Sequence, residues 1–202
     1  MLCIFGYGAF SFFEIRFNMK KEGFKMKKNT KKTVMMGMLT ALSIVLVALI
    51  RIPFPTAPFL EYDPADIPIL LGTILYGAGG GLIITVAVSV LQGITVSAGS
   101  GIIGIMMHIF STGIYVVVAG LLSGNKNIKR VALALFLGAL AMTLSMILWN
   151  MIFTPIFMNQ PFEVVKGMLL PIILPFNLIK SMVNGLITYI LYCFMKKIKG
   201  IV

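Results

Sequence analysis

The last long apolar segment of this chain contains the run Pro175-Phe176-Asn177-Leu178-Ile179-Lys180. A lysine at the centre of a membrane-spanning helix costs about 3 kcal/mol to insert, so it is seldom found there without a partner or a functional role. Asn177 and Lys180 are three residues apart and share one helix face, which Asn184 extends by a turn. This polar stripe on an apolar helix predicts a membrane protein with a buried binding site.

The composition agrees with this interpretation. The chain has 202 residues, of which 59% are hydrophobic and only 11% charged. Long apolar runs alternate with short basic clusters, which is typical of a polytopic membrane protein. A net charge of +11 can indicate nucleic-acid binding, but the basic residues here gather at the ends of apolar segments. Membrane orientation explains that distribution better, and we expect no nucleic-acid partner.

The sequence offers little support for an enzyme. Cys3 and Cys193 have no metal-binding or redox spacing, and His108 has no second histidine to share a metal ion. We find neither paired intramembrane carboxylates nor a Ser/His constellation. The G-x-x-x-x-G-K-[ST] motif of P-loop ATPases is also absent, so any ATP-driven step requires another polypeptide. We therefore predict a non-enzymatic protein without a metal or cofactor of its own.

Six apolar segments predict an all-α integral membrane protein with six transmembrane helices. Their approximate limits are 34–50, 66–77, 82–96, a fourth segment ending near 122, 131–153 and 168–195. The four prolines of Arg51–Ala65 forbid a regular helix there, so we expect a structured first loop. Gly79-Gly80-Gly81 is expected to make the turn between the second and third segments.

Basic clusters predict the orientation of these segments. They precede the first segment, separate the fourth from the fifth, and follow the sixth: Lys27, Lys28, Lys31 and Lys32; Lys126, Lys129 and Arg130; Lys196, Lys197 and Lys199. Six spans place all three clusters on one side, which the positive-inside rule makes cytoplasmic. Both termini are then cytoplasmic and the first loop is extracellular.

This topology gives three domains of unequal size. Residues 1–33 form a cytoplasmic N-terminal segment, 34–195 a single six-helix transmembrane domain that binds the substrate, and 196–202 a basic cytoplasmic tail. We expect that residues 1–25 come from a start codon assigned too far upstream. Met26 and the lysines after it are typical of the natural cytoplasmic start of a membrane protein.

Polar residues converge on the extracellular side. Asn150 lies near the outer end of the fifth segment, and Asn177 and Lys180 lie in the outer half of the sixth. Pro171 and Pro175 are expected to bend or delay the last helix, which brings Asn177 near an effective helix start. Together with the first loop, these residues predict an outward-facing pocket.

Three stretches carry a resemblance to a known family. The run Ile173–Lys180 resembles the final-helix motif of riboflavin-specific substrate-binding (S) components of energy-coupling factor (ECF) transporters. So does Ala141-Met142-Thr143 followed by Asn150 and Pro155, and the first-loop run Leu60–Pro68 is similar to the family's loop sequence. The resemblance covers about residues 30–195, in the family's order.

The resemblance implies a six-helix protein of the bacterial plasma membrane that binds riboflavin. It implies two kinds of partner, a transmembrane coupling subunit and two cytoplasmic ATPases that power import. It assigns ligand contacts to Asn150, Asn177 and Lys180, and near Leu60 and Glu61. Glu61 departs from the family, which commonly has a lysine there, and Gln92–Gly101 replaces a more charged connection.

The residue chemistry fits a flavin without being unique to it. Asparagine can donate to and accept from the imide edge of an isoalloxazine ring, and a lysine ammonium can donate to carbonyl or ribityl oxygens. The rest of the wall should be apolar and aromatic. Candidates for that wall are Phe54, Phe59, Trp149, Phe153 and Phe176.

Gly37 and Ala41 form a small-xxx-small pair in the first helix, which permits close helix approach. In S components a similar pair docks on the coupling subunit, and the resemblance assigns that role here. Packing within the chain is the alternative.

Other interpretations stay open at this stage. The three asparagines can instead form hydrogen bonds between helices: Asn150, Asn177 and Asn184. Lys180 can form an ion pair with Glu61, Asp63 or Asp66. An S component for a different vitamin or precursor is the main alternative function. A stand-alone secondary transporter is less favoured, because the sequence has no clear inverted repeat or buried acid-rich pathway.

Overall fold

The computed structural model describes residues 28–124 and 126–198. The chain divides into two compact units, Met1–Val34 and Met35–Val202, and every residue of the site discussed below belongs to the second. Residues 1–25, which we expect to precede the natural start, fall outside the described residues together with Lys27 and Lys199 of the basic clusters.

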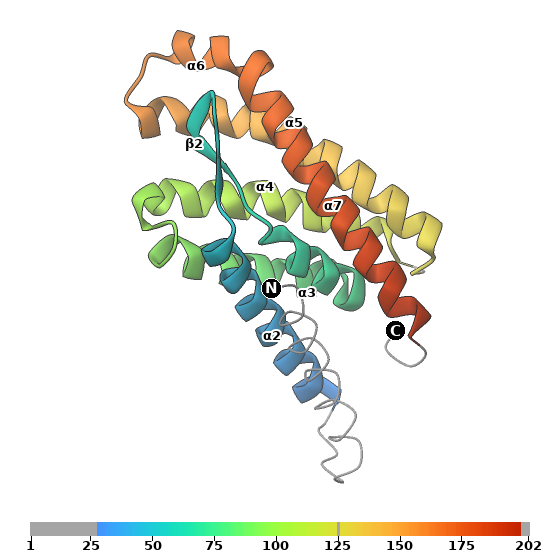
Figure 1. Cartoon of the computed structure of the whole chain (residues 1–202). Helices are drawn as coiled ribbons and strands as arrows, with labels where there is room; N and C mark the ends of the chain where they lie inside the picture. The colour runs from blue at the N-terminus through green and yellow to red at the C-terminus, as the bar shows by residue number, and fades with distance from the viewer. Residues whose placement is uncertain (1–27, 125, 199–202) are drawn as a thin grey trace, which may run out of the picture. The chain divides into compact units, whose positions relative to one another are not determined.

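The protein is mostly helical (Figure 1). In chain order its elements are α2 (Lys28–Leu49), β1 (Ile52–Phe54), β2 (Ala57–Tyr62), α3 (Asp66–Ile94), the 3₁₀ turn η1 (Ala98–Ser100), α4 (Gly101–Leu122), α5 (Ile128–Met158), α6 (Phe162–Met168), the π-helical turn η2 (Leu169–Ile173) and α7 (Leu174–Lys197). In the described ranges, five helical stretches are long and apolar enough to cross a membrane. The protein is therefore a multi-pass membrane protein.

The helix α3 is interrupted at Gly77, where φ is 80° and ψ is 176°. Glycine adopts this left-handed φ readily because it has no Cβ. A Cβ placed on Gly81 would lie 3.0 Å from the Cβ of Thr73, whereas residues eight apart in a straight helix are about 12 Å apart. The two halves of α3 therefore fold back on each other as a helical hairpin.

This hairpin corrects the sequence analysis on one point. The turn lies at Gly77, while Gly79, Gly80 and Gly81 are helical. The structure uses Gly81 for packing, because any side chain there would collide with Thr73 and Val116. The expected segments 66–77 and 82–96 correspond to the two arms of the hairpin.

Successive helices pack in order, α3 on α4, α4 on α5 and α5 on α7. Tyr115 of α4 is fully buried against Gly138 of α5 and Gly185 of α7, where a Cβ would overlap its ring or hydroxyl. Its hydroxyl donates to the Ser181 carbonyl at 3.3 Å. Small residues at such contacts let membrane helices approach closely. Large apolar side chains cover the exposed face of α5, as a lipid-facing surface requires: Leu133, Phe136, Leu144, Leu148 and Ile152.

The first loop forms an antiparallel β-hairpin in which Ile52 pairs with Tyr62 and Pro53 with Glu61. The expected structured, non-helical loop is therefore present, although its strands were not anticipated. Arg51 forms an ion pair with Glu61 and also donates to the Val96 carbonyl at 2.6 Å. These contacts attach the loop to the link that follows α3.

The last apolar segment is divided between α6, η2 and α7. Pro171 lies in the π-helical turn, and Pro175 lies in the first turn of α7. Proline has no N–H group and so breaks the regular hydrogen-bond ladder. The interruption expected from these prolines is present, and it places Asn177 in the first turn of α7.

Candidate functional site

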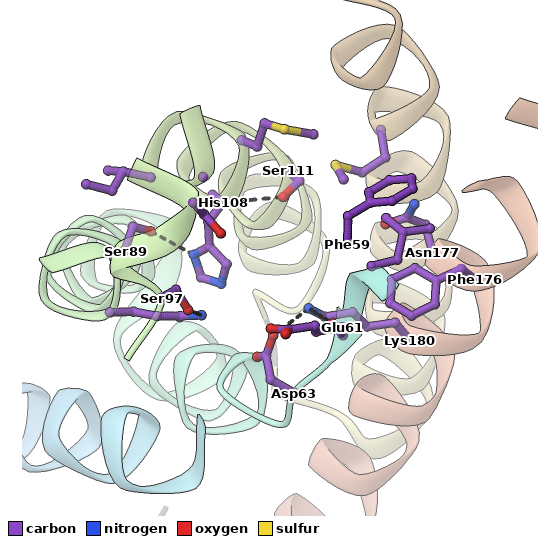
Figure 2. A pocket seen from close by; sticks show the side chains of 18 of the residues that line it. Phe59, Glu61, Asp63, Ser89, Ser97, His108, Ser111, Phe176, Asn177 and Lys180 are labelled. Atoms are coloured by element: carbon purple, nitrogen blue, oxygen red, sulfur yellow. Dashed lines mark hydrogen bonds and ion pairs between the residues drawn. The ribbon is translucent and has the colours of Figure 1, made fainter. Parts of the chain in front are cut away.

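A cavity of about 170 Å³ lies between the first loop and the helices α3, α4, α5 and α7 (Figure 2). Four of the five predicted ligand-binding residues line it: Leu60, Glu61, Asn177 and Lys180. Residues 119 positions apart in the sequence meet here, since the Lys180 ammonium lies 3.4 Å from the Glu61 carbonyl oxygen. The structure therefore brings the polar face of α7 and the first loop together around one cavity.

Lys180 has a carboxylate partner, Asp63. Its Nζ lies 2.7 Å from Asp63 Oδ2, and the two side chains are only 11% and 8% exposed. Burial by itself would raise the pKa of Asp63, but the Lys180 ammonium beside it holds that pKa below its ordinary value. The backbone N–H of Ala65 also donates to Asp63. Of the three pairings left open by the sequence, the structure contains the one with Asp63.

Asn184 lies one turn further along α7 and does not line the cavity. Its amide nitrogen donates to the Asp63 carbonyl at 3.1 Å and to Asp66 Oδ2 at 3.2 Å. Its Oδ1 accepts a hydrogen bond from the Tyr62 hydroxyl at 3.0 Å. Asn184 thus ties the first loop and α3 to α7, which confirms the structural interpretation of this residue.

Asn177 is buried and faces the cavity beside Phe176 (Figure 2). Its Nδ2 donates to the Ile173 carbonyl at 2.8 Å. Around it the wall is apolar, formed by Phe59, Leu60, Met142, Met146 and Phe176. Of the predicted aromatic residues, Phe59 and Phe176 line the cavity, whereas Phe54 packs on Phe176 from outside the lining.

Asn150 is not among the cavity-lining residues. Its Nδ2 donates to the Met146 carbonyl and its Oδ1 accepts from the Thr154 hydroxyl, both at 2.8 Å. Both ends of the amide are therefore engaged within α5. Trp149 and Phe153 also lie outside the lining, and Trp149 stacks with both Phe110 and Phe153.

One wall of the cavity was missed by the sequence analysis. The second arm of α3, the link after it, and α4 contribute polar side chains: Ser89, Gln92, Ser97, Ser100, His108 and Ser111. His108 Nδ1 lies 2.7 Å from Ser89 Oγ. The sequence suggests only a metal-binding role for His108, and the described residues contain no cluster of metal-binding side chains. The available signal was the i, i+3 spacing of Ser89 and Gln92 on one helix face.

Gly37 and Ala41 lie on an exposed face of α2. No heavy atom lies within 4 Å of a Cβ placed on Gly37. Close packing of this pair within the described part of the second unit is therefore not observed.

The comparisons with known proteins agree with this architecture. Residues 31–192 match the family model described as ECF transporter, substrate-specific component. The chain belongs to this family. Its relatives are named as transporters and not as enzymes, which agrees with the non-enzymatic role expected from the sequence.

Two relatives of this S component illustrate the similarity. The riboflavin transporter FmnP of Bacillus subtilis is 28% identical over 176 residues, covering 82% of this chain and 92% of the relative. The riboflavin transporter RibU of Lactococcus lactis subsp. cremoris is 27% identical over 196 residues, covering 84% and 95%.

Solved structures agree on the fold. An S component of a bacterial ECF transporter superposes with a TM-score of 0.73 at 24% identity, covering 84% of this chain and 98% of that one. The S component for biotin from an ECF-type ABC transporter gives 0.50 at 19% identity, covering 87% and 97%. At these identities the likeness establishes the fold alone.

Proposed function

We propose that this S component binds riboflavin with high affinity and mediates its ATP-driven uptake across the bacterial plasma membrane. The observation that carries the proposal is the cavity at which Asn177 and Lys180 of α7 meet Leu60 and Glu61 of the first loop. The relatives named riboflavin transporters support a flavin as the ligand.

The lining suits the chemistry of a flavin ring. Isoalloxazine is flat and uncharged, and its imide edge carries carbonyl acceptors and one N–H donor. Asn177 offers an amide, and the Lys180 ammonium retains one N–H donor beyond those directed at Asp63 Oδ2 and the Glu61 carbonyl. Phe59 and Phe176 supply apolar wall on the same side. The cavity is smaller than the ~300–1,000 Å³ usual for ligand pockets, so binding requires lining side chains to move apart.

Asn150 belongs to the proposed site through the family resemblance. Its amide is already bonded to the Met146 carbonyl and the Thr154 hydroxyl, so contact with the ligand requires it to exchange these bonds. We propose that this exchange accompanies binding.

The proposed topology has six crossings, because the α3 hairpin supplies two arms. Lys129 and Arg130 begin α5, and Lys196 and Lys197 end α7. The positive-inside rule makes these ends cytoplasmic, which puts the first loop and the cavity on the extracellular side. Residues 1–33 and 196–202 are then the cytoplasmic flanks of a single substrate-binding domain, 34–195.

ATP-driven transport requires partners, because the chain contains no P-loop ATPase motif. We propose a transmembrane coupling subunit and two cytoplasmic ATPase subunits of an ECF module. The exposed Gly37 and Ala41 of α2 are the proposed docking site for the coupling subunit, since small residues permit close helix contact.

A titration of the purified protein against a panel of vitamins tests this function. Riboflavin should bind with quenched flavin fluorescence, and with higher affinity than the other vitamins. Tight binding of another vitamin with no flavin binding would instead support an S component of different specificity. Riboflavin uptake by cells that lack the ECF module would support a stand-alone transporter.

A further inference from the structure

Two buried polar atoms in the described residues have no hydrogen-bond partner, Gln92 Oε1 and His108 Nε2. Both residues line the same cavity, Gln92 from the second arm of α3 and His108 from α4. Buried polar atoms in folded proteins are nearly always hydrogen-bonded, so an orphaned atom requires an explanation. Two such atoms in one ligand cavity indicate groups that a ligand satisfies.

The His108 imidazole is held in place through its other nitrogen. Nδ1 lies 2.7 Å from Ser89 Oγ, and the Ser89 hydroxyl also lies 2.7 Å from the Thr85 carbonyl. Nε2 lies 3.6 Å from Asp66 Oδ1, beyond hydrogen-bond distance. Figure 2 shows the ring extending into the cavity on the side where Glu61 and Asp63 lie. One edge of His108 is thus anchored, while Nε2 has no hydrogen-bond partner among the described residues.

Asp66 does not depend on His108 for its hydrogen bonds. Its Oδ1 accepts from the Thr112 hydroxyl at 2.9 Å, and its Oδ2 accepts from Asn184 Nδ2 at 3.2 Å. The carboxylate therefore keeps direct partners when His108 Nε2 bonds elsewhere.

Gln92 is arranged in a similar way. Its Nε2 donates to Ser97 Oγ at 3.3 Å, which fixes the amide and leaves Oε1 as an acceptor. The cavity is two-sided as a result. The α5 and α7 side is mostly apolar and aromatic around Asn177 and Lys180, whereas the α3 and α4 side combines hydroxyl, amide and imidazole groups with the apolar Ile105 and Met107.

We propose that this polar α3–α4 wall is a subsite for the hydroxylated chain of the ligand. Each alcohol group both donates and accepts a hydrogen bond. It can therefore donate to Gln92 Oε1, and it can bond to His108 Nε2 whichever tautomer the imidazole ring adopts. The flat ring then lies against the apolar wall beside Asn177 and Lys180. This orientation rests on the proposed riboflavin function. It extends that function by assigning one end of the flavin to each wall.

Two ligands that share the same ring but differ in the side chain can distinguish the contributions of the two walls. Lumiflavin carries a methyl group where riboflavin carries the ribityl chain. We would titrate the purified full chain with both ligands, using wild type, Gln92→Met and His108→Phe. Each substitution should raise the Kd for riboflavin by about tenfold and change the Kd for lumiflavin by less than about twofold.

The matched control is Thr188→Val, a buried hydroxyl of α7 that bonds to the Asn184 carbonyl and does not line the cavity. Its affinities for both ligands should equal those of wild type. Lumiflavin binding also reports that each variant is folded. Gln92→Met is the safer variant in this respect, because methionine is close to glutamine in length and shape, whereas phenylalanine is larger than histidine.

The outcomes distinguish this inference from the function on which it rests. If wild type binds neither flavin, the riboflavin function fails. If wild type binds both but Gln92→Met leaves riboflavin affinity unchanged, or weakens both ligands equally, the polyol subsite is wrong while the riboflavin function stands.

Discussion

Lys180 Nζ lies 2.7 Å from Asp63 Oδ2, which joins the last helix to the first loop across 117 positions of sequence. Both side chains are almost fully buried. A buried ion pair gains little over an apolar pair, but removal of one partner leaves the other charge uncompensated at a cost of about 3–5 kcal/mol. The pair therefore couples the loop to α7 as well as shaping the cavity.

The first prediction concerns this coupling. Lys180→Met and Asp63→Asn should each lower the thermal unfolding midpoint of the purified protein. The double variant should be less destabilised than the sum of the two, because neither buried charge then remains unpaired. Unfolding curves of the four proteins in one detergent form the double-mutant cycle. Strictly additive shifts would show that the two residues do not interact.

The second prediction concerns the two asparagines. Asn177→Ala should weaken riboflavin binding by about 1–3 kcal/mol, because a buried polar group of the complex loses its partner. Asn150→Ala should weaken it less, since the wild-type amide gives up its bonds to Met146 and Thr154 when it turns to the ligand. Fluorescence titration measures both effects. A larger loss for Asn150→Ala would contradict the arrangement of α5 described here.

These two asparagines show which features of the site can be predicted from the sequence and which cannot. The 3.6-residue period put Asn177 and Lys180 on one face, and the prolines before them placed Asn177 at a helix start. The Asn150 amide can form hydrogen bonds either within its own helix or with the ligand. The spacing of residues in the sequence does not indicate which of the two it forms. The resemblance supplied the proposed ligand contact of Asn150, whereas the structure shows its hydrogen bonds to Met146 and Thr154.

The polar α3–α4 wall could not be predicted from the sequence, for a different reason. Gln92 and His108 meet in one cavity only because α3 doubles back at Gly77 and η1 returns the chain to α4. The glycine run 79–81 was the stronger turn signal, yet those residues are helical. Gly81 is needed instead for close packing against Thr73 and Val116, a tertiary requirement that the glycine run does not reveal.

The third prediction concerns docking on α2. Gly37→Leu should lower riboflavin uptake by cells while riboflavin binding to the purified protein persists, because the added side chain blocks close helix contact outside the cavity. Leu42→Phe is the control, since it adds bulk to an exposed position roughly 140° around the same helix. Loss of binding together with uptake in Gly37→Leu would favour a role in internal packing.

The last prediction tests the α3 hairpin with two glycines of the same helical arm. A Cβ on Gly79 meets nothing within 4 Å, whereas a Cβ on Gly81 would lie against Thr73 of the opposite arm and Val116 of α4. Gly79→Ala should therefore leave the thermal unfolding midpoint unchanged or raise it slightly, as helix propensity favours alanine. Gly81→Ala should lower it, since the arms must separate to admit a methyl group. Thermal unfolding of both variants with and without riboflavin measures the difference. Equal midpoints would mean that the arms do not pack through Gly81, and the cavity wall that depends on this hairpin would then lose its structural basis.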